Sequence, residues 1–369
     1  MTPFNVGSRA AEELCKALKQ RQKHVEISSV LSLEALLEEA YRAEPRLTGI
    51  VLGWKGQRTG SALTLSKTYS VDLEYSTDFV DNLDDVIIDD GSWKPSDFLA
   101  AVNELPKVIQ VVTKDAEDLQ RRVRQDHHTR RERFPGMHAC ECTWHDRYVN
   151  GCTVMWIRLE CCVDPERYKM YDMLAKREVE RVASQIFGKG NIPKLLKTFL
   201  AFSYLQQTCE YDQEMADLLT MKQVEHMERP WVSLAYGALR KRMAVCEGVA
   251  AAFKLFMDFC GVPNRIVFGS LSEDYEEADH CWNMVCLDGK HYHIDATYGL
   301  NGRSVFVGAF LKSDAEMRQT HHWDPSGYPA CTLSRIDYDY VEDYVSEHMD
   351  ELLRLGVDEK YLCPDEIRE

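Results

Sequence analysis

The sequence predicts an α+β fold in which two small β-α-β-β-like modules precede a larger domain of helices and short antiparallel strands. Two stretches, 24–69 and 107–162, share the order strand, helix, strand, turn, strand, which indicates an internal repeat of low sequence identity. Farther along, segments with helical apolar spacing alternate with short apolar runs. One helical segment begins at Cys246, and a strand pair around Asp288-Gly289 follows it.

The first module is expected over residues 1–75. The segment 1–22 is rich in Ala, Glu and Lys from Ser8 onward and predicts a helix. Next we expect a strand over 24–28 and a helix over 32–43, which Pro45 ends. Two strands, 47–53 and 62–69, then flank a turn that contains glycine.

Residues 76–106 are expected to form an acidic linker, because they carry six aspartates between positions 78 and 90. A calcium loop would need Gly and Glu at fixed spacing, and neither is in place. We therefore expect these carboxylates to face solvent. The basic run Arg121–Arg133 is mixed with Asp and Glu and is also expected to face water.

The second module is expected over residues 107–185. It comprises a β-branched strand over 107–113, a helix over 115–131, strands over 140–149 and 152–162, and a helix over 164–185. The two later strands flank Asn150-Gly151, a strong signal for a tight hairpin. Zinc is an alternative use of this hairpin, which carries His138, Cys140, Cys142, His145, Cys152, Cys161 and Cys162. The Cys-x-Cys spacing is not the usual zinc knuckle, so we favour ordinary strand alternation and expect neither a metal nor a cofactor.

A catalytic domain is expected over 186–310, and a C-terminal extension over 311–369 is expected to pack on it. Helices are predicted over 193–210, 231–240, 246–259 and 340–355, with a strand over 265–269 and a hairpin around Asp288-Gly289. The stretch His321-His322-Trp323 and the following Tyr328-Pro329 are expected either to cover a cleft or to form an ordinary packed tail.

Composition excludes several classes of protein. The 369 residues carry a formal charge of −16 and a pI near 5.3, which argues against broad binding to nucleic acid or anionic membranes. No run of about eighteen apolar residues and no phosphate-binding glycine motif occurs, and the Ala/Glu/Lys-rich first segment is expected to be a helix and not a secretory signal. Thirteen cysteines, an odd number in a chain of this size, favour the reducing cytoplasm.

Cys246, His280 and Asp295 are the candidate catalytic residues. Cys246 begins a predicted helix, where unpaired amides and the helix dipole favour a thiolate. If Asp288-Gly289 is a two-residue turn, paired positions add to 577, and His280 and Asp295 share one face on a diagonal of about 7–8 Å. Asp295 would then orient His280, which takes the proton of Cys246. His293 has the same parity and remains a rival base, although Trp282 would give His280 an aromatic wall.

The chain resembles the transglutaminase-like superfamily, a papain-like group in which Cys, His and Asp occur in that order. Several spaced motifs over about residues 190–300 carry the resemblance: Val245-Cys246-Glu247-Gly248-Val249-Ala250, Gly261-Val262-Pro263-Asn264-Arg265, His280-Cys281-Trp282-Asn283, Asp288-Gly289-Lys290 and His293-Ile294-Asp295-Ala296-Thr297, with Glu210-Tyr211-Asp212 upstream. Val249 and Cys281 depart from the family, where Tyr and Ala are common. The resemblance implies a helix-borne Cys246 nucleophile packed on a small antiparallel sheet, His280 as base and then acid, and Asp295 as the orienting group.

The resemblance implies thiol acyl chemistry on the amides of a protein or peptide substrate. The amide of Cys246 is one expected oxyanion donor, and Trp231, Tyr236 and Gln223 are weaker candidates for the second. Hydrolysis is favoured over cross-linking, because cross-linking needs water to be excluded. Two alternatives stay open: a non-catalytic scaffold that retains the domain, and a regulatory shield formed by residues 1–185. The oligomeric state cannot be predicted.

Overall fold

The computed structural model describes residues 4–48, 50–59, 67–75, 85–96, 108–144, 152–189, 191–271, 280–300, 302, 304–333, 338–363 and 367–368. The chain divides into two compact units, and neither is continuous in sequence. The first contains residues 1–127 and 139–160, and the second contains residues 128–138 and 161–369. Among the described residues, no helix is both long and apolar enough to cross a membrane.

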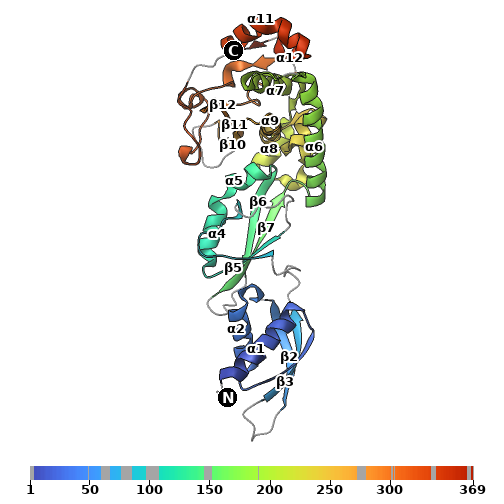
Figure 1. Cartoon of the computed structure of the whole chain (residues 1–369), viewed down its shortest axis with the longest axis vertical. Helices are drawn as coiled ribbons and strands as arrows, with labels where there is room; N and C mark the ends of the chain where they lie inside the picture. The colour runs from blue at the N-terminus through green and yellow to red at the C-terminus, as the bar shows by residue number, and fades with distance from the viewer. Residues whose placement is uncertain are drawn as a thin grey trace. The chain divides into compact units, whose positions relative to one another are not determined.

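The first module combines two helices with an antiparallel three-stranded sheet (Figure 1). Its elements are α1 (Phe4–Lys19), β1 (His24–Ser29), α2 (Leu33–Ala43), β2 (Val51–Thr59) and β3 (Lys67–Tyr75), with strand order β1-β3-β2. Ser32 caps α2, because its side chain accepts a hydrogen bond from the amide of Ala35. Leucines of both helices and valines of the sheet share one buried core.

The hairpin strands of this module lie later in the chain than predicted. The predicted strand over 47–53 begins only at Val51, because Pro45–Leu47 forms a 3-10 turn that buries Leu47. The second strand begins at Lys67 instead of Ala62 and continues to Tyr75, and residues 60–66 lie outside the described part. The side chains of 54–59 are exposed, so no apolar alternation marks this half of β2.

A second sheet has the strand order β4-β5-β7-β6 (Figure 1). Its strands are β4 (Val86–Ile88), β5 (Val108–Thr113), β6 (Met137–Trp144) and β7 (Thr153–Cys161), and its helices are α4 (Ala116–Gln125) and α5 (His127–Arg133). The order β5-β7-β6 repeats the order β1-β3-β2 of the first sheet. The predicted helix over 115–131 is divided at Asp126, and the predicted turn Asn150-Gly151 lies outside the described residues.

Part of the segment predicted as a solvated acidic linker is built into this sheet. Strand β4 pairs in parallel with β5. Asp89 directly follows β4 and is 8% exposed, and its carboxylate accepts hydrogen bonds from Arg122 at 2.7 Å and from Thr113 at 2.8 Å. Arg122 belongs to the basic run predicted to face water, and it is buried because it neutralises Asp89.

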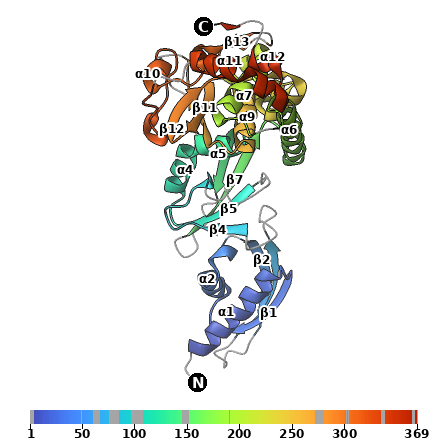
Figure 2. The same cartoon turned by 45° about the horizontal axis from the view of Figure 1, so that its top comes forward.

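The second unit places one central helix on a small antiparallel sheet. Helix α9 (Cys246–Phe259) packs on β10 (Asn264–Gly269) and β11 (His280–Leu287), and β12 (Lys290–Ile294) completes the order β10-β11-β12, labelled in Figure 1; Figure 2 shows α9, β11 and β12 from a second direction. Helices α6 (Pro165–Ile186) and α7 (Lys194–Thr208) contact the other side of α9 and share its core. The later helices are α10 (Asp314–Met317), α11 (Tyr338–Leu355) and α12 (Glu359–Leu362), and Val341, Val345 and Leu352 of α11 enter the same core.

Short elements connect α7 to α9. Strand β8 (Glu210–Tyr211) pairs in parallel with β9 (Met243–Ala244), and α8 (Gln213–Thr220) lies between them in sequence. The predicted helix over 231–240 is instead a 3-10 turn, Pro230–Ser233, followed by a π-helical turn, Gly237–Lys241. The chain folds back tightly at Gly237, where a Cβ atom would lie 2.8 Å from two backbone oxygens. The last strands, β13 (Val305–Phe306) and β14 (Ile367–Arg368), pair in parallel.

Candidate active site

Cys246 is the first residue of α9, at a helix end whose N-cap residue, Val245, provides no side-chain hydrogen bond. The residue is partly exposed, and its side chain packs against the buried cluster that contains Ala250 and Cys281. The backbone of α9 approaches the preceding turn so closely that a Cβ atom on Gly248 would lie 2.1 Å from the carbonyl oxygen of Val232. The glycine therefore fixes where the helix begins and where its unpaired amides point.

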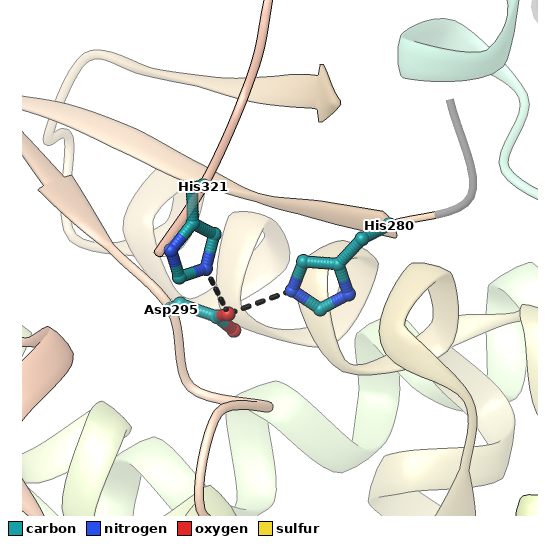
Figure 3. A group of neighbouring side chains, drawn as sticks. All are labelled: His280, Asp295 and His321. Carbon is teal, nitrogen blue, oxygen red and sulfur yellow. Dashed lines mark hydrogen bonds and ion pairs between the residues drawn. The ribbon is translucent and has the colours of Figure 1, made fainter. Parts of the chain in front are cut away.

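The hairpin brings His280 and Asp295 together, in the register that the sequence predicts. Asn283 pairs with Ile294, and Leu287 pairs with Lys290, so paired positions add to 577. Nε2 of His280 lies 2.7 Å from Oδ2 of Asp295, and both side chains are buried (Figure 3). A diagonal position on one face of the sheet is thus close enough for a direct hydrogen bond.

Four donors surround the Asp295 carboxylate. Oδ1 accepts the amides of Thr297 at 2.8 Å and Tyr298 at 3.1 Å. Oδ2 accepts Nε2 of His280 and, at 3.0 Å, Nε2 of His321. Burial alone would raise the pKa of Asp295, but the charge and hydrogen bond of His280 and the hydrogen bond of His321 hold it well below its usual range. Asp295 is therefore a carboxylate that accepts from both imidazoles.

His280 has two partners on opposite sides of its ring. Burial opposes its positive charge, yet the Asp295 carboxylate and the hydrogen bonds to Asp295 and Cys246 raise its pKa to about 10. Because Nε2 faces Asp295, the contact with the thiol uses Nδ1. This arrangement holds a proton on the imidazole next to the sulfur of Cys246.

The thiol of Cys246 is stabilised in its ionised form. A hydrogen bond from the side chain of Cys281 and, next, the hydrogen bond and charge of His280 lower its pKa well below the usual value, against the effect of burial. The pKa of Cys281 is raised correspondingly, by its bond to Cys246 and by burial. The two thiols thus have different charges, and Cys246 is the one held as a thiolate.

The rival base His293 belongs to a different network. Trp282 stacks on His280 with ring centroids 5.9 Å apart, and its indole nitrogen donates to Nδ1 of His293 at 2.9 Å. The remaining proton of His293 is then on Nε2, which donates to Asp314 at 2.8 Å. Burial lowers the pKa of His293 to about 4. Its proton is thus directed to Asp314 and away from Asp295.

Trp231 and Tyr236 lie in an aromatic group with Tyr171, and Trp231 also packs on the cluster that contains Val245. Tyr236 stacks on Tyr171 with centroids 4.4 Å apart, and Trp231 packs edge-on to Tyr236 at 6.5 Å. Tyr236 lines a pocket with Tyr168 and Tyr171 that includes none of Cys246, His280 and Asp295. The third upstream candidate, Gln223, is exposed.

Tyr211 lies next to Cys246 instead. Its strand β8 pairs with β9, two residues before Cys246, and its hydroxyl oxygen accepts a hydrogen bond from the backbone amide of Cys246. Burial raises the pKa of this phenol, so it remains a donor. The motif Glu210-Tyr211-Asp212 was visible in the sequence, but no local signal indicates that its hydroxyl returns to Cys246.

Arg131, which lies far upstream in the sequence, contacts the residue that follows Cys246. Its Nε donates to Glu247, the residue after Cys246, at 3.0 Å, and its guanidinium lies 4.8 Å from the ring centre of Phe268. The side chains of Arg131 and Glu247 are 18% and 6% exposed. The prediction that this basic run faces water is wrong here, because the guanidinium neutralises a buried carboxylate.

Two groups of side chains could be considered as metal ligands among the described residues: His280 with Asp295 and His321, and His293 with Asp314 and Cys331. In the second group, Trp282 donates to Nδ1 of His293, so Nε2 keeps its proton and has no lone pair for a metal. Of the alternative zinc cluster on the second hairpin, His145 and the side chains of His138 and Cys140 lie outside the described residues.

Residues 182–296 match the sequence profile of the transglutaminase-like superfamily. The chain is also similar to a solved structure described as a TGase, with 17% identity over 74% of this chain and 76% of that one and a TM-score of 0.31. A second solved structure, a proposed cysteine protease from Cytophaga hutchinsonii, shares 12% identity over 44% of this chain and 63% of that one, with a TM-score of 0.26. No curated protein sequence gives a significant match.

Proposed function

We propose that the second unit, whose residues 182–296 match the transglutaminase-like superfamily, is a thiol enzyme that acts on amide bonds of a protein or peptide. Cys246 is the nucleophile, His280 is the base and then the acid, and Asp295 orients His280. One observation carries this proposal: His280 lies between a carboxylate on one ring nitrogen and a thiol of lowered pKa on the other. This is the arrangement that nucleophilic acyl transfer requires.

The proposed reaction has two steps. The Cys246 sulfur bonds to the carbonyl carbon of the amide, and the C–N bond breaks as His280 gives its proton to the leaving nitrogen. The hydroxyl of Tyr211, which accepts from the Cys246 amide in the free protein, would donate its own proton to the oxygen that becomes negative between these events, and the Cys246 amide would turn from Tyr211 to the same oxygen. Water then attacks the thioester and gives a proton to His280, and the acid product leaves as the Cys246 thiolate returns.

Hydrolysis is the outcome we favour over transfer to an amine. Part of residue Cys246 is exposed to solvent at the start of α9, which supports access of water to a thioester formed there. Cross-linking would require water to be excluded from the thioester until an amine binds. The expected class is therefore a protease, deamidase or amidase.

The first experiment is alkylation by iodoacetamide across pH, with the modified cysteine located by mass spectrometry. Cys246 should react at neutral pH at least tenfold faster than Cys260, whose pKa burial raises to about 11. In a His280→Ala variant, the apparent pKa of Cys246 should rise toward that of a free thiol. Equal rates for the two cysteines, together with no effect of His280→Ala, would contradict the proposal.

A second experiment separates hydrolysis from transfer. Peptides with a glutamine side chain or a cleavable backbone amide are incubated with the protein, with and without hydroxylamine. A thioester partitions to a hydroxamate when hydroxylamine is present and to the acid when it is absent. Cys246→Ser should abolish both products, and a hydroxamate with no acid would point to a transferase.

A further inference from the structure

His321 is a fully buried histidine that shares an oxygen with the candidate base (Figure 3). It follows α10 and lies outside the segment 182–296 that matches the family. Its Nε2 is 3.0 Å from Oδ2 of Asp295, the oxygen that also accepts from His280 at 2.7 Å. The proposed catalytic scheme gives this histidine no role.

The hydrogen bonds define where His321 carries its proton. Asp295 is ionised and only accepts, so Nε2 of His321 donates. Its Nδ1 lies 2.8 Å from the hydroxyl of Thr320, which can donate to it. One ring proton, on Nε2, therefore satisfies both contacts.

The ring of His321 is held in place from several directions. Trp282 contacts it edge-on with centroids 4.8 Å apart, and Tyr298 contacts it at 5.4 Å. Its backbone amide donates to the carbonyl of Met317 at 2.9 Å, at the end of α10. The Nε2 proton is thus presented to Asp295 by a fixed ring.

We propose that His321 is a positioning residue, which shares one carboxylate oxygen with His280 and limits how strongly Asp295 holds the His280 proton. Each hydrogen bond to a carboxylate lowers its basicity, so a second donor on Oδ2 weakens the pull of Asp295 on His280. An acid that must give its proton to a leaving nitrogen works best when it does not hold that proton too tightly. The catalytic benefit rests on the proposed function, whereas the effect on His280 does not.

The test is the NMR titration of His280 in protein with 13C-labelled histidine. All variants carry Cys246→Ser, because this removes the thiolate and leaves Asp295 and His321 as the groups that act on His280. His321→Gln and His321→Met are matched in length, and only Gln keeps an N–H for Asp295. His322→Ala is the neighbouring control, since the contact of that residue with Ser270 is made by the main chain.

In His321→Met, the pKa of His280 should rise by about one unit, because the Asp295 oxygen then accepts a hydrogen bond from His280 alone. His321→Gln should leave that pKa within about 0.3 units of the value with histidine, and His322→Ala should not change it. Equal pKa values in the Met and Gln variants would overturn the proposal, as would a fall in the Met variant.

A metal ion held by His280, Asp295 and His321 is the competing explanation of this cluster. A change in the His280 titration on adding EDTA to the unsubstituted protein would overturn the shared-oxygen arrangement, and no change supports it. The outcome is independent of the enzyme proposal. If Cys246 proves unreactive while the Met and Gln variants still differ, the proposed function fails and the role of His321 remains.

Discussion

At the residue scale, the ionised thiol of Cys246 depends on a neighbour that the family usually lacks. A hydrogen bond from the Cys281 thiol lowers the pKa of Cys246, and the hydrogen bond and charge of His280 act in the same direction. Cys281→Ala should therefore raise the apparent pKa of Cys246 in the iodoacetamide profile, while His280 keeps it below that of a free thiol. Cys331→Ala, which removes another buried thiol, should leave the profile unchanged. An unchanged profile in Cys281→Ala would remove Cys281 from the site.

The role of Tyr211 can be tested by removing a single atom, its hydroxyl oxygen. Tyr211→Phe removes the hydroxyl beside the Cys246 backbone and should lower kcat/KM for an amide substrate by about 100-fold. Alkylation of Cys246 at neutral pH should stay within about twofold, because no oxyanion forms in that reaction. Tyr236→Phe is the control, since Tyr236 packs against Tyr171. Equal losses in both variants would argue against a specific oxyanion donor.

The pair formed by Cys246 and His280 should also determine how stability depends on pH. In the unfolded chain, His loses its proton near pH 6.5 and Cys near pH 8.5. In the folded protein the thiol pKa is lowered and the His280 pKa is raised to about 10, so the pair holds one proton between these limits. The unfolded pair also holds one proton between about pH 6.5 and 8.5, and its contribution to stability is then flat. Above about pH 8.5 the folded state holds more protons, and stability falls as pH rises toward 10.

Cys246→Ser should move the start of this alkaline loss from about pH 8.5 to about 6.5, because only His280 then titrates. Relative to the unsubstituted protein, the free energy of unfolding should fall by up to about 1.4 kcal/mol per pH unit in that window. Urea denaturation at pH 6.5, 7.5 and 8.5 measures the difference. Parallel curves for the two proteins would mean that no thiolate–imidazolium pair exists.

At the scale of elements, the start of α9 depends on a close backbone approach. A Cβ atom at position 248 would lie 2.1 Å from a carbonyl oxygen of the preceding 3-10 turn, so Gly248→Ala must displace backbone. We expect it to lower the free energy of unfolding by about 1–3 kcal/mol and to slow alkylation of Cys246. Gly327→Ala meets no atom within 4 Å and should change stability by less than about 0.5 kcal/mol. Urea denaturation of the two variants provides the comparison, and equal stabilities would refute the close approach.

The elements that the sequence predicts best are those fixed by local chemistry. The hairpin of β11 and β12 has the predicted register because Asp288 and Gly289 both adopt the positive φ that a two-residue turn needs. Helix α9 begins and ends as predicted, because its apolar spacing and the following Gly261 are local signals. The segment 231–240 has similar spacing, but tertiary contacts at Gly237 divide it into two turns.

Residues that join the site from a distance could not be predicted. His321 and Asp295 are 26 positions apart, and Arg131 and Glu247 are 116 positions apart, so no periodicity connects them. A basic run such as Arg121–Arg133 usually faces solvent, and only the fold shows that Arg122 and Arg131 meet buried carboxylates. The pairing rules of a hairpin predict that Asp295 and His280 lie close together, but they predict nothing about residues outside the hairpin.

At the scale of the whole molecule, the family match covers only part of the compact unit that carries the candidate site. Residues 182–296 contain Cys246, His280 and Asp295, whereas His321 and Arg131 lie after and before them. The second unit takes residues 128–138 from between two segments of the first. The sequence predicts a domain boundary near residue 186, in the gap between two predicted helices. The two compact units instead divide the chain after residues 127, 138 and 160.

The ion pair between Arg131 and Glu247 has a consequence for synthesis of the chain. Arg131 leaves the ribosome 116 residues before Glu247. At roughly 5–20 residues per second, the guanidinium is without its carboxylate for about 6–23 s. The second unit therefore cannot complete its packing during translation of its first part, and the nascent chain exposes the surface for α9 until the sequence beyond Glu247 has emerged.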